Sequence, residues 1–539
     1  MKASNNLREH IAALEEKGLL VRVKREINKD TEMHPLVRWQ YRGGLPEKER
    51  KAFLFENVVD NRGRKYDIPV GVGVHSASRY VYSVGLGCKP EPEEIISKWE
   101  YALSHPIEPV VVSEGPVQEV VHLGEKLKKE GGGVDMFPVP ISTPGFDNAP
   151  YFTCANWTTR DPETGLLNVG NYRAQIKARD KLGVCFGALG QDGLFHWRKC
   201  LERGIPLEAA VVVGAPLVVA YAAVEKIPRG VEEFSVAGGL AGEPIRLVKC
   251  KTVNIDVPAE AEVVFEGLIS TEYLEPEGPF GESHGHMNPR QLNPFFEIKA
   301  ITHRKNPIWT SWISQVTPSE SSAIKKIAYE ALFYRYLKYE RRVKSVTRVV
   351  MHEALTNLRK VIIIQMKDPT EEEIWRGLQS AIVRDPGVGK IVIAVDDDID
   401  PEDLDAVFWA LSYRMRPHKD VLIVPGRTKG HGPPFPELST FGVPPEADDS
   451  ALLMNAILKE PFPPVSLPKR EYMERAKEIW EELGLPQLRP QSPWFGYSLG
   501  HWSDEYEEEA KLALEGKHYL TGEKLASRRV KAEEVKGGG

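Results

Sequence analysis

The sequence predicts a mixed α/β protein built from two regions joined by a helix. Residues 151–300 hold many short runs of valine and isoleucine separated by glycine and proline, a pattern typical of a β-barrel or sandwich. After about residue 345, apolar strands alternate with helical segments, which indicates βαβ units around a largely parallel sheet. Between the regions, Thr317-Pro318-Ser319-Glu320 has the form of a capping box, and it predicts a long helix to about Tyr339.

The remaining elements follow from local patterns. A helix is expected over 5–20, with Leu7, Ile11 and Leu14 on one face and Gly18 as its stop. Residues 105–150 are rich in proline and glycine, which indicates loops and sheet edges. The strands expected in the first region include Ala209–Val213, Val218–Ala222, Arg246–Val248 and Val263–Phe265. Those of the second region are Val361–Gln365, Ile391–Val395 and Val421–Val424, with helices at Thr370–Ile382 and Pro401–Tyr413.

These patterns divide the chain into five parts. We expect an N-terminal α/β region over 1–115, a barrel domain over 116–316 and a linking helix over 317–345. An α/β domain over 346–465 follows, and then a C-terminal part over 466–539 with an amphipathic helix near Lys469–Leu485 and a charged tail.

Composition excludes some classes of function. The chain has 539 residues, of which 42% are hydrophobic and 27% charged, so it can bury a sizeable core. Its net charge of -7 argues against a protein that binds nucleic acid or an anionic membrane. The five cysteines form no C-x-x-C pair, and the N-terminus has no apolar segment of signal-peptide type. We therefore expect a cytoplasmic location.

The most informative motif runs from Glu277 to Glu282, with the sequence Glu-Gly-Pro-Phe-Gly-Glu. Two carboxylates on one rigid turn would compete for charge, so one of them would hold a proton near neutral pH, as a general acid requires. Arg173, in the segment Asn168–Arg173, could pair with a carboxylate and keep it ionised. A solvated loop and a strand with an exposed arginine are the alternative interpretations.

Other residues offer weaker signals. Asn168, His196 and Glu233 would supply one nitrogen and two oxygens to a divalent ion, although a packed surface histidine explains His196 equally well. The aspartates of 396–400 fit the N-terminal turn of a helix, and Gly387–Lys390 lacks the spacing of a Walker A loop.

Several motifs taken together, in their order and spacing, resemble the UbiD decarboxylases. The resemblance spans roughly residues 5–485. The motifs that carry it are Asn168-Val169-Gly170-x-Tyr172-Arg173, Ile227-Pro228-x-Gly230-Val231-x-Glu233, Leu247–Cys250, Val257-Pro258-Ala259-x-Ala261-Glu262, Glu277–Glu282, Val395–Asp400, Trp409-Ala410 and Arg414.

The resemblance implies a split β-barrel that binds a prenylated FMN, a linking helix and an α/β oligomerisation domain. It also implies a manganese or other divalent ion, with potassium nearby. Arg173, Glu277 and Glu282 match the family's Glu-Arg-Glu catalytic set, and Asn168, His196 and Glu233 would be the metal ligands, with Gln191 as the alternative to His196. The cofactor-binding residues implied are Asn168, Gly170, Asn171, Tyr172, Arg173, His196, Ala223, Glu233 and Lys459.

The activity implied is reversible, non-oxidative decarboxylation of an aromatic, heteroaromatic or α,β-unsaturated carboxylic acid. A CoA thioester that carries such a carboxylate is a further candidate substrate. Glu282 would transfer the proton, while Arg173 and Glu277 would be its electrostatic partners. Family members form dimers or hexamers and receive their cofactor from a flavin prenyltransferase. The alternatives are a subunit of a multi-subunit carboxylase and a flavin oxidoreductase. Pocket walls are expected around Trp309–Val316 and Thr428–Phe441.

Overall fold

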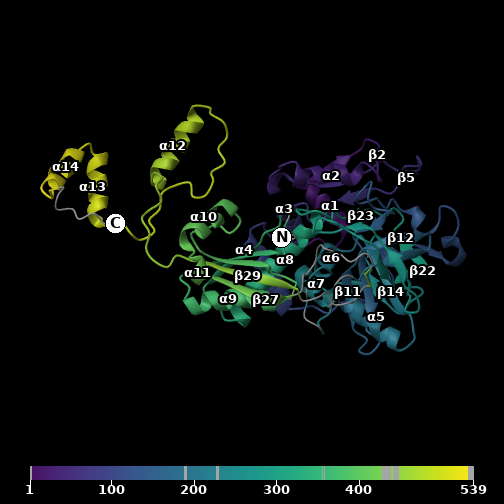
Figure 1. The fold of residues 1–539 in the computed structure, drawn as a ribbon. Coiled ribbons are helices and arrows are strands. Elements are labelled where there is room, and N and C mark those ends of the chain that lie inside the picture. The colour runs from purple at the N-terminus through teal and green to yellow at the C-terminus, as the bar shows by residue number, and fades with distance from the viewer. Residues whose placement is uncertain are drawn as a thin grey trace. The chain divides into compact units, whose positions relative to one another are not determined.

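A computed structural model describes residues 3–186, 191–225, 227, 230–354, 356, 359–385, 387–427, 439–440 and 448–531. Two compact units divide the chain. One comprises Met1–Ile393 with Leu422–Met454, and the other comprises Ala394–Val421 with Asn455–Gly539. The mixed α/β fold class is confirmed, because strands and helices are interspersed along the chain (Figure 1).

The N-terminal elements form a small four-stranded sheet with helices around it. The helix α1 (Leu7–Glu16) begins at the N-cap Asn6 and ends before Gly18, whose φ of 66° stops it. The helices α2 (Met33–Arg42), α3 (Arg79–Leu86) and α4 (Pro92–Ser104) follow. The sheet order is β1 (Leu20–Val23), β3 (Ala52–Phe55), β6 (Val70–Val72) and β23 (Trp309–Ser311). Its last strand comes from the end of the barrel region, so the two regions are interleaved.

A nine-stranded sheet dominates the middle of the chain and carries the predicted barrel pattern. Its main path is antiparallel, and β8 (Val120–Leu123) pairs with β22 beside it. The strands on the path, in order, are β11 (Leu167–Asn171), β10 (Asn156–Arg160), β14 (Leu207–Val213), β17 (Val263–Ile269), β22 (Phe295–His303), β13 (Lys181–Val184), β12 (Ala174–Ala178) and β9 (Tyr151–Phe152).

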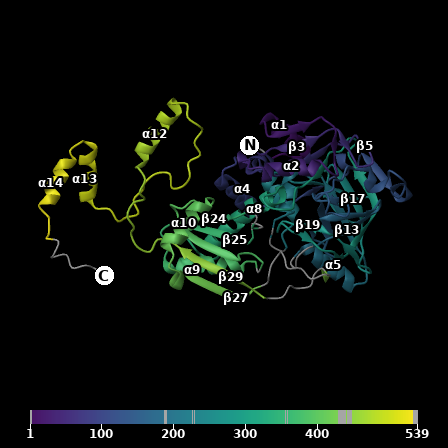
Figure 2. The same cartoon turned by 45° about the horizontal axis from the view of Figure 1, so that its top comes forward.

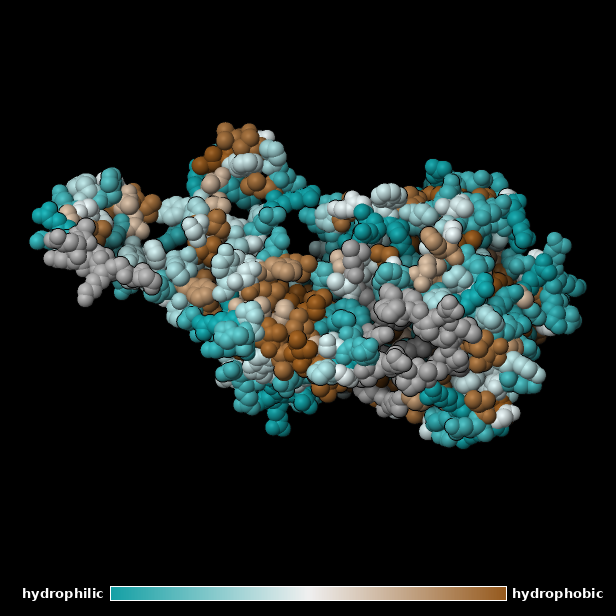
Figure 3. Space-filling model, in the orientation of Figure 1, coloured by the Kyte–Doolittle hydropathy of each residue, from teal (hydrophilic) through white to brown (hydrophobic). Residues whose placement is uncertain are grey.

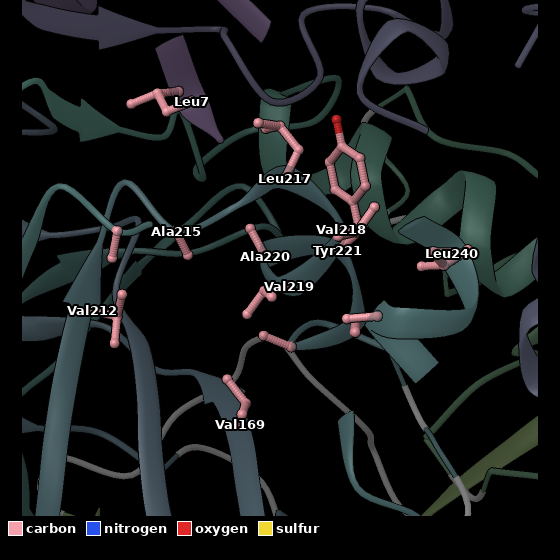
Figure 4. Close-up of a cluster of buried hydrophobic side chains, with 14 of the residues drawn as sticks. Leu7, Val169, Val212, Ala215, Leu217, Val218, Val219, Ala220, Tyr221 and Leu240 are labelled. Atoms are coloured by element: carbon pink, nitrogen blue, oxygen red, sulfur yellow. The ribbon is translucent and has the colours of Figure 1, made fainter. Parts of the chain in front are cut away.

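Helices cover the β11 end of this sheet. The helix α6 (Leu217–Ala222) is fully buried, and α7 (Glu233–Ala241) packs against it. Figure 4 shows α6 side chains between Leu7 of α1 and Val169 of β11, in one buried apolar cluster. The prediction of a strand over Val218–Ala222 is wrong, because Pro216 starts a helix there. A short apolar run has no period that separates a buried strand from a buried helix.

The linking helix exists but begins two residues later than predicted. The helix α8 (Glu320–Arg335) continues as a π-helical turn (Tyr336–Glu340), close to the predicted end at Tyr339. Its N-cap is Ser319, whose capping box uses Ser322, so the predicted box of Thr317 with Glu320 is wrong. Glu320 is instead buried, and its carboxylate accepts the backbone N–H groups of Gly73 and His75 at 2.8 and 3.0 Å.

A five-stranded sheet follows α8, in the order β24 (Val346–Met351), β25 (Val361–Met366), β26 (Ile391–Asp396), β29 (Asp449–Ala456) and β27 (Val421–Arg427). The helix α9 (Glu371–Val383) packs on β25, and α10 (Leu404–Arg414) follows β26. All predicted strands and helices of this region are confirmed within about three residues at each end. The pair β24–β25 is antiparallel. Figure 3 shows hydrophobic side chains gathered over β27 and β29 on one face.

The C-terminal part carries α12 (Arg470–Glu482), α13 (Asp504–Leu514) and α14 (His518–Ala526). None of these three helices has a buried residue. Among the helices in the described ranges, none combines the length and apolar character that crossing a bilayer demands.

Candidate active site

The centre of the site is an ion-pair group of one arginine and two glutamates. Arg173 follows β11, and its guanidinium donates through Nε to Glu277 Oε1 at 3.0 Å and through Nη2 to Glu277 Oε2 at 2.8 Å. Its Nη1 donates to Glu282 Oε1 in a short contact. The Glu277 side chain is 0% exposed, whereas that of Glu282 is 23% exposed. One guanidinium therefore holds a fully buried carboxylate at two points and a more accessible one at a single point.

Two short strand pairs shape the loop that carries the glutamates. Glu277 ends β18 (Glu275–Glu277), and Glu282 follows β19 (Phe280–Gly281), which pairs with β20 (Met287–Asn288). Gly278 between them has a φ of 105°, a conformation that favours glycine. Asn148 donates its amide to the Gly278 carbonyl at 2.9 Å and fastens the turn. The turn thus directs both carboxylates toward Arg173.

The electrostatics favour a charged arginine and raise the pKa of one nearby acid, Asp147. Burial opposes the Arg173 charge, but Cys185, Glu277 and Glu282 outweigh it and raise the pKa of Arg173 well above its usual value. Asp147, which the sequence did not reveal, lies within the electrostatic reach of Arg173. Burial raises the pKa of Asp147 to about 6, against the opposing effect of its hydrogen bonds and of Arg173.

Strand β11 and its continuation form a narrow cradle. A Cβ atom on Gly170 would lie 2.4 Å from the Tyr172 hydroxyl, so this position admits only glycine with Tyr172 in place. Asn171 donates its side-chain amide to the Thr153 carbonyl at 3.3 Å and its backbone N–H to the Ala223 carbonyl at 3.1 Å. Its Oδ1 is buried without a hydrogen-bond partner among the described residues. The cradle therefore retains hydrogen-bonding capacity for a ligand.

Glu233 provides the clearest sign of a cation site. It begins α7 and accepts the Val169 N–H at 2.8 Å. Burial raises the pKa of Glu233 to about 8, and the nearby charge of Asp192 adds to the increase. Asn168 lies next to Val169, and its Nδ2 is buried with no hydrogen-bond partner in the described ranges. A buried carboxylate beside a second acid fits a divalent cation, which would restore the carboxylate to its charged form. Asn168 would bind such an ion through its amide oxygen, because the unpaired Nδ2 is a donor.

His196, the third metal ligand that the resemblance implies, contacts Thr159 and Asp161. Its Nδ1 lies 2.9 Å from Thr159 Oγ1, and its Nε2 lies 4.0 Å from Asp161 Oδ2, which also pairs with Lys199 at 2.7 Å. Both ring nitrogens thus face groups on or just after β10. Asp192, at the start of α5 (Asp192–Glu202), is the additional acid that influences Glu233. No spacing rule could have found it, and its neighbour Gln191 is the N-cap of the same helix.

Lys459 and the expected pocket walls complete the predicted positions. The Lys459 ammonium pairs with Asp420 at 3.0 Å and donates to the carbonyls of Arg414 and Asn455 at 2.9 Å each, which occupies its three N–H groups within its own unit. Trp309 and Trp312 are each 1% exposed and belong to the core. In the segment Thr428–Phe441, only Ser439 and Thr440 lie inside the described residues, where they pair with β21 (Gln291–Asn293).

Comparison with known proteins identifies the family of this chain. Three family models match consecutive parts of the chain: the UbiD N-terminal domain at residues 11–99, the UbiD Rift-related domain at 109–316 and the UbiD C-terminal domain at 322–433, all described as 3-octaprenyl-4-hydroxybenzoate carboxy-lyase domains. The chain belongs to the UbiD family. It is therefore an enzyme of the carboxy-lyase class, and the resemblance inferred from the motifs is confirmed.

Individual proteins are similar to this chain over most of their length. An uncharacterized protein of Archaeoglobus fulgidus is 31% identical over 450 residues, which is 78% of this chain and 87% of the relative. The UbiD-class enzyme HmfF from Pelotomaculum thermopropionicum, solved with prFMN, is 28% identical with a TM-score of 0.74, over 88% of this chain and 100% of that one. The vanillic acid decarboxylase of Sedimentibacter hydroxybenzoicus is 26% identical with a TM-score of 0.72, over 90% and 99%.

Proposed function

We propose that this UbiD-family enzyme catalyses the reversible decarboxylation of an aromatic, heteroaromatic or α,β-unsaturated acid with a prenylated FMN. The observation that carries the proposal is the unequal contact of Arg173 with the two glutamates. That arrangement gives two carboxylates different environments at one site, which is how proteins assign acid and base roles.

The contacts give each residue a task. Glu277 is buried and held at two points by Arg173, so it keeps the guanidinium in place. Glu282 is held at one point and reaches solvent, so it can release its proton and take up another. In decarboxylation Glu282 would protonate the carbon that carbon dioxide has left, and in carboxylation it would remove that proton. Arg173 would also orient the carboxylate of the substrate.

The residues present fit the implied cofactor and ion. When bound, a prenylated flavin supplies the electron sink that makes loss of carbon dioxide feasible. Gly170, Asn171, Tyr172 and Ala223 would line its cradle, where Asn171 Oδ1 has no hydrogen-bond partner within the described part of the chain. Asn168 and Glu233 would hold a manganese or similar divalent ion, with Asp192 close by.

Further expectations complete the proposal. The HmfF structure contains prFMN, which supports the same cofactor here, and a flavin prenyltransferase would supply it. We propose a homodimer or homohexamer, since the edge strand β27 exposes Leu422 and Ile423. A potassium ion near the cofactor and a cytoplasmic location, where the five free cysteines would stay reduced, are also proposed. The five-part division of the chain remains our proposal, supported by the bounds of the family models.

The test is co-expression of the chain with a flavin prenyltransferase. Mass spectrometry of the denatured protein should show a flavin heavier than FMN, and the purified enzyme should release carbon dioxide from at least one acid of a panel of benzoates, cinnamates and furoates. Recovery of unmodified FMN alone, together with consumption of a nicotinamide cofactor, would instead indicate a flavin oxidoreductase.

A further inference from the structure

Arg38 is a partly buried cation whose partners are neutral. It lies on α2, where its Nη2 donates to Gln315 Oε1 and its Nη1 donates to the Val316 carbonyl at 3.3 Å. No carboxylate in the described ranges pairs with it. Burial lowers the pKa of Arg38 to about 10, the charge of Arg42 adds to the decrease, and Tyr41 only partly opposes it. A guanidinium has five N–H donors, so donors remain after these two contacts.

The partners of Arg38 lie directly behind the Glu282 hairpin. A Cβ atom on Gly281, the residue before Glu282, would lie 2.7 Å from Gln315 Cγ, so the Gln315 side chain packs against the hairpin. One on Gly285 would lie 3.8 Å from a methyl group of Val316. Arg38 thus reaches the hairpin through one layer of side chains. Figure 2 labels α2, which carries Arg38, and β19, which leads into the hairpin.

Gln315 adds an unused donor at the same place. Its side chain is 4% exposed, and its Nε2 is buried with no hydrogen-bond partner among the described residues. Its Oε1 is taken by Arg38. Buried amide hydrogens without an acceptor are rare in folded proteins, because leaving them unpaired costs free energy. An amide donor and a guanidinium therefore lie together behind the hairpin that carries Glu282, and neither has an anionic acceptor among the described residues.

We propose that Arg38 and Gln315 form a subsite for a second carboxylate of the substrate, remote from the one that leaves as carbon dioxide. The inference deepens the proposed function and rests on it, because it makes the substrate a dicarboxylic acid. A carboxylate would accept from the free N–H groups of Arg38 and from Gln315 Nε2, and would supply the negative charge that the described residues do not. A neutral hydroxyl would use the hydrogen bonds but leave the guanidinium uncompensated.

The experiment compares the affinities of matched acids for the prenylated-FMN holoenzyme. Dissociation constants for benzoate, 4-hydroxybenzoate and the three benzenedicarboxylates are measured calorimetrically on a Glu282→Gln background, so that no acid is consumed. At least one dicarboxylate should bind about 10- to 100-fold more tightly than benzoate, the range expected for hydrogen bonds between charged groups. Arg38→Met should bring that dicarboxylate to the affinity of benzoate, and Arg38→Lys should retain part of the difference.

Two further variants keep the result interpretable. Arg42→Met changes an exposed arginine on the same helix, so it should preserve the preference for the dicarboxylate. Gln315→Glu places a carboxylate of the protein against Arg38, so it should remove the preference even if Arg38→Met does not fold. A preference that survives Arg38→Met or Gln315→Glu overturns the subsite, as does 4-hydroxybenzoate binding as tightly as the best dicarboxylate. The proposed function is tested separately. If the subsite is overturned but the wild-type holoenzyme still releases carbon dioxide from any acid, the proposed function remains supported.

Discussion

At the scale of single residues, the feature with the clearest chemical meaning is that Arg173 makes two hydrogen bonds to Glu277 and one to Glu282. The motif at 277–282 predicted two competing carboxylates, but nothing local could say which one an arginine over one hundred positions away would hold more firmly. The structure gives Glu277 two contacts and Glu282 one. The periodicity of apolar residues predicts only which face of a helix or strand a residue occupies. The unequal contacts of Glu277 and Glu282 depend instead on how the turn at Gly278 directs their side chains.

The proton-transfer role of Glu282 predicts the effect of a conservative substitution. Glu282→Gln keeps the size and the hydrogen-bonding oxygen but removes the titrating group. The rate of decarboxylation should fall by about 10²–10⁴, as is typical when a general acid is lost, while the flavin content stays at the wild-type level. The measurement is single-turnover carbon dioxide release together with the absorbance of the bound flavin. Near wild-type turnover on the true substrate would assign the proton to another group, with Asp147 the next to replace.

The environment of Glu233 predicts which residues hold the divalent ion. Glu233→Gln should weaken manganese binding to the cofactor-free protein by at least about tenfold, because a buried anion is removed from the site. His196→Ala should change the affinity by less than about threefold, since both ring nitrogens face Thr159 and Asp161. Titration calorimetry with manganese measures both. The opposite ranking of the two variants would identify His196, rather than Glu233, as the main ligand of the ion.

At the scale of elements, local sequence patterns predicted the positions of most helices and strands but not the residues that cap the start of the linking helix. The box predicted from Thr317 and Glu320 is displaced to Ser319 and Ser322, because Glu320 is needed elsewhere as an acceptor for Gly73 and His75. Tertiary contacts of Glu320 decide between the two overlapping capping boxes, and these contacts cannot be predicted from the local sequence. The same limit applies to α6, whose five-residue apolar run fits a strand or a helix equally well.

The N-terminal elements bury three histidines that should make the protein sensitive to acid. Burial lowers the pKa of His10 to about 4 and of His34 and His75 to about 3. Between about pH 6.5 and those values the unfolded chain binds protons that the folded protein does not. Each histidine should therefore remove about 1.4 kcal/mol of unfolding free energy per pH unit as the pH falls, and contribute nothing above about 6.5.

Denaturant unfolding of a variant isolates this effect. His10→Gln keeps an N–H donor for the Val74 carbonyl but cannot titrate, so its unfolding free energy should fall less steeply than that of the wild type between pH 6 and pH 4.5. His105→Gln, at an exposed histidine, should keep the wild-type slope. Equal slopes for the wild type and His10→Gln would mean that His10 takes up a proton while still folded.

At the scale of the whole molecule, motif order was sufficient to predict the family, because many modest motifs in one order are collectively specific. The family models extend to residue 433 and leave the C-terminal part outside them. What the sequence could not supply is the set of surfaces left open once the elements are folded. Strand β27 lies at the end of its sheet with Leu422 38% exposed and Ile423 64% exposed, on the region that Figure 3 shows as hydrophobic.

An exposed apolar edge strand predicts self-association through β27. Ile423→Lys introduces a charge on that edge and should shift the enzyme toward smaller species at micromolar concentration, because edge strands that carry lysine resist pairing. Val121→Lys, on the exposed strand β8, is the matched control and should leave the assembly unchanged. Sedimentation velocity measures both. A wild-type assembly that persists in Ile423→Lys would place the contact elsewhere.

The helices α12–α14 should exchange their backbone amide hydrogens with solvent much faster than the buried strands do. Each has only 9–13 residues and buries none of them, so on its own each is close to the length at which helices in water melt and re-form rapidly. Their amide hydrogens should then exchange with deuterated water within seconds, while those of β14 and β17 stay protected for hours. Any surface that covers these helices would slow the exchange of their amides and leave the rest of the chain unchanged. Slower exchange in α12–α14 would therefore report that the chain has bound a partner. Equal protection along α13 and β17 in dilute monomer would show that these helices are stable without one.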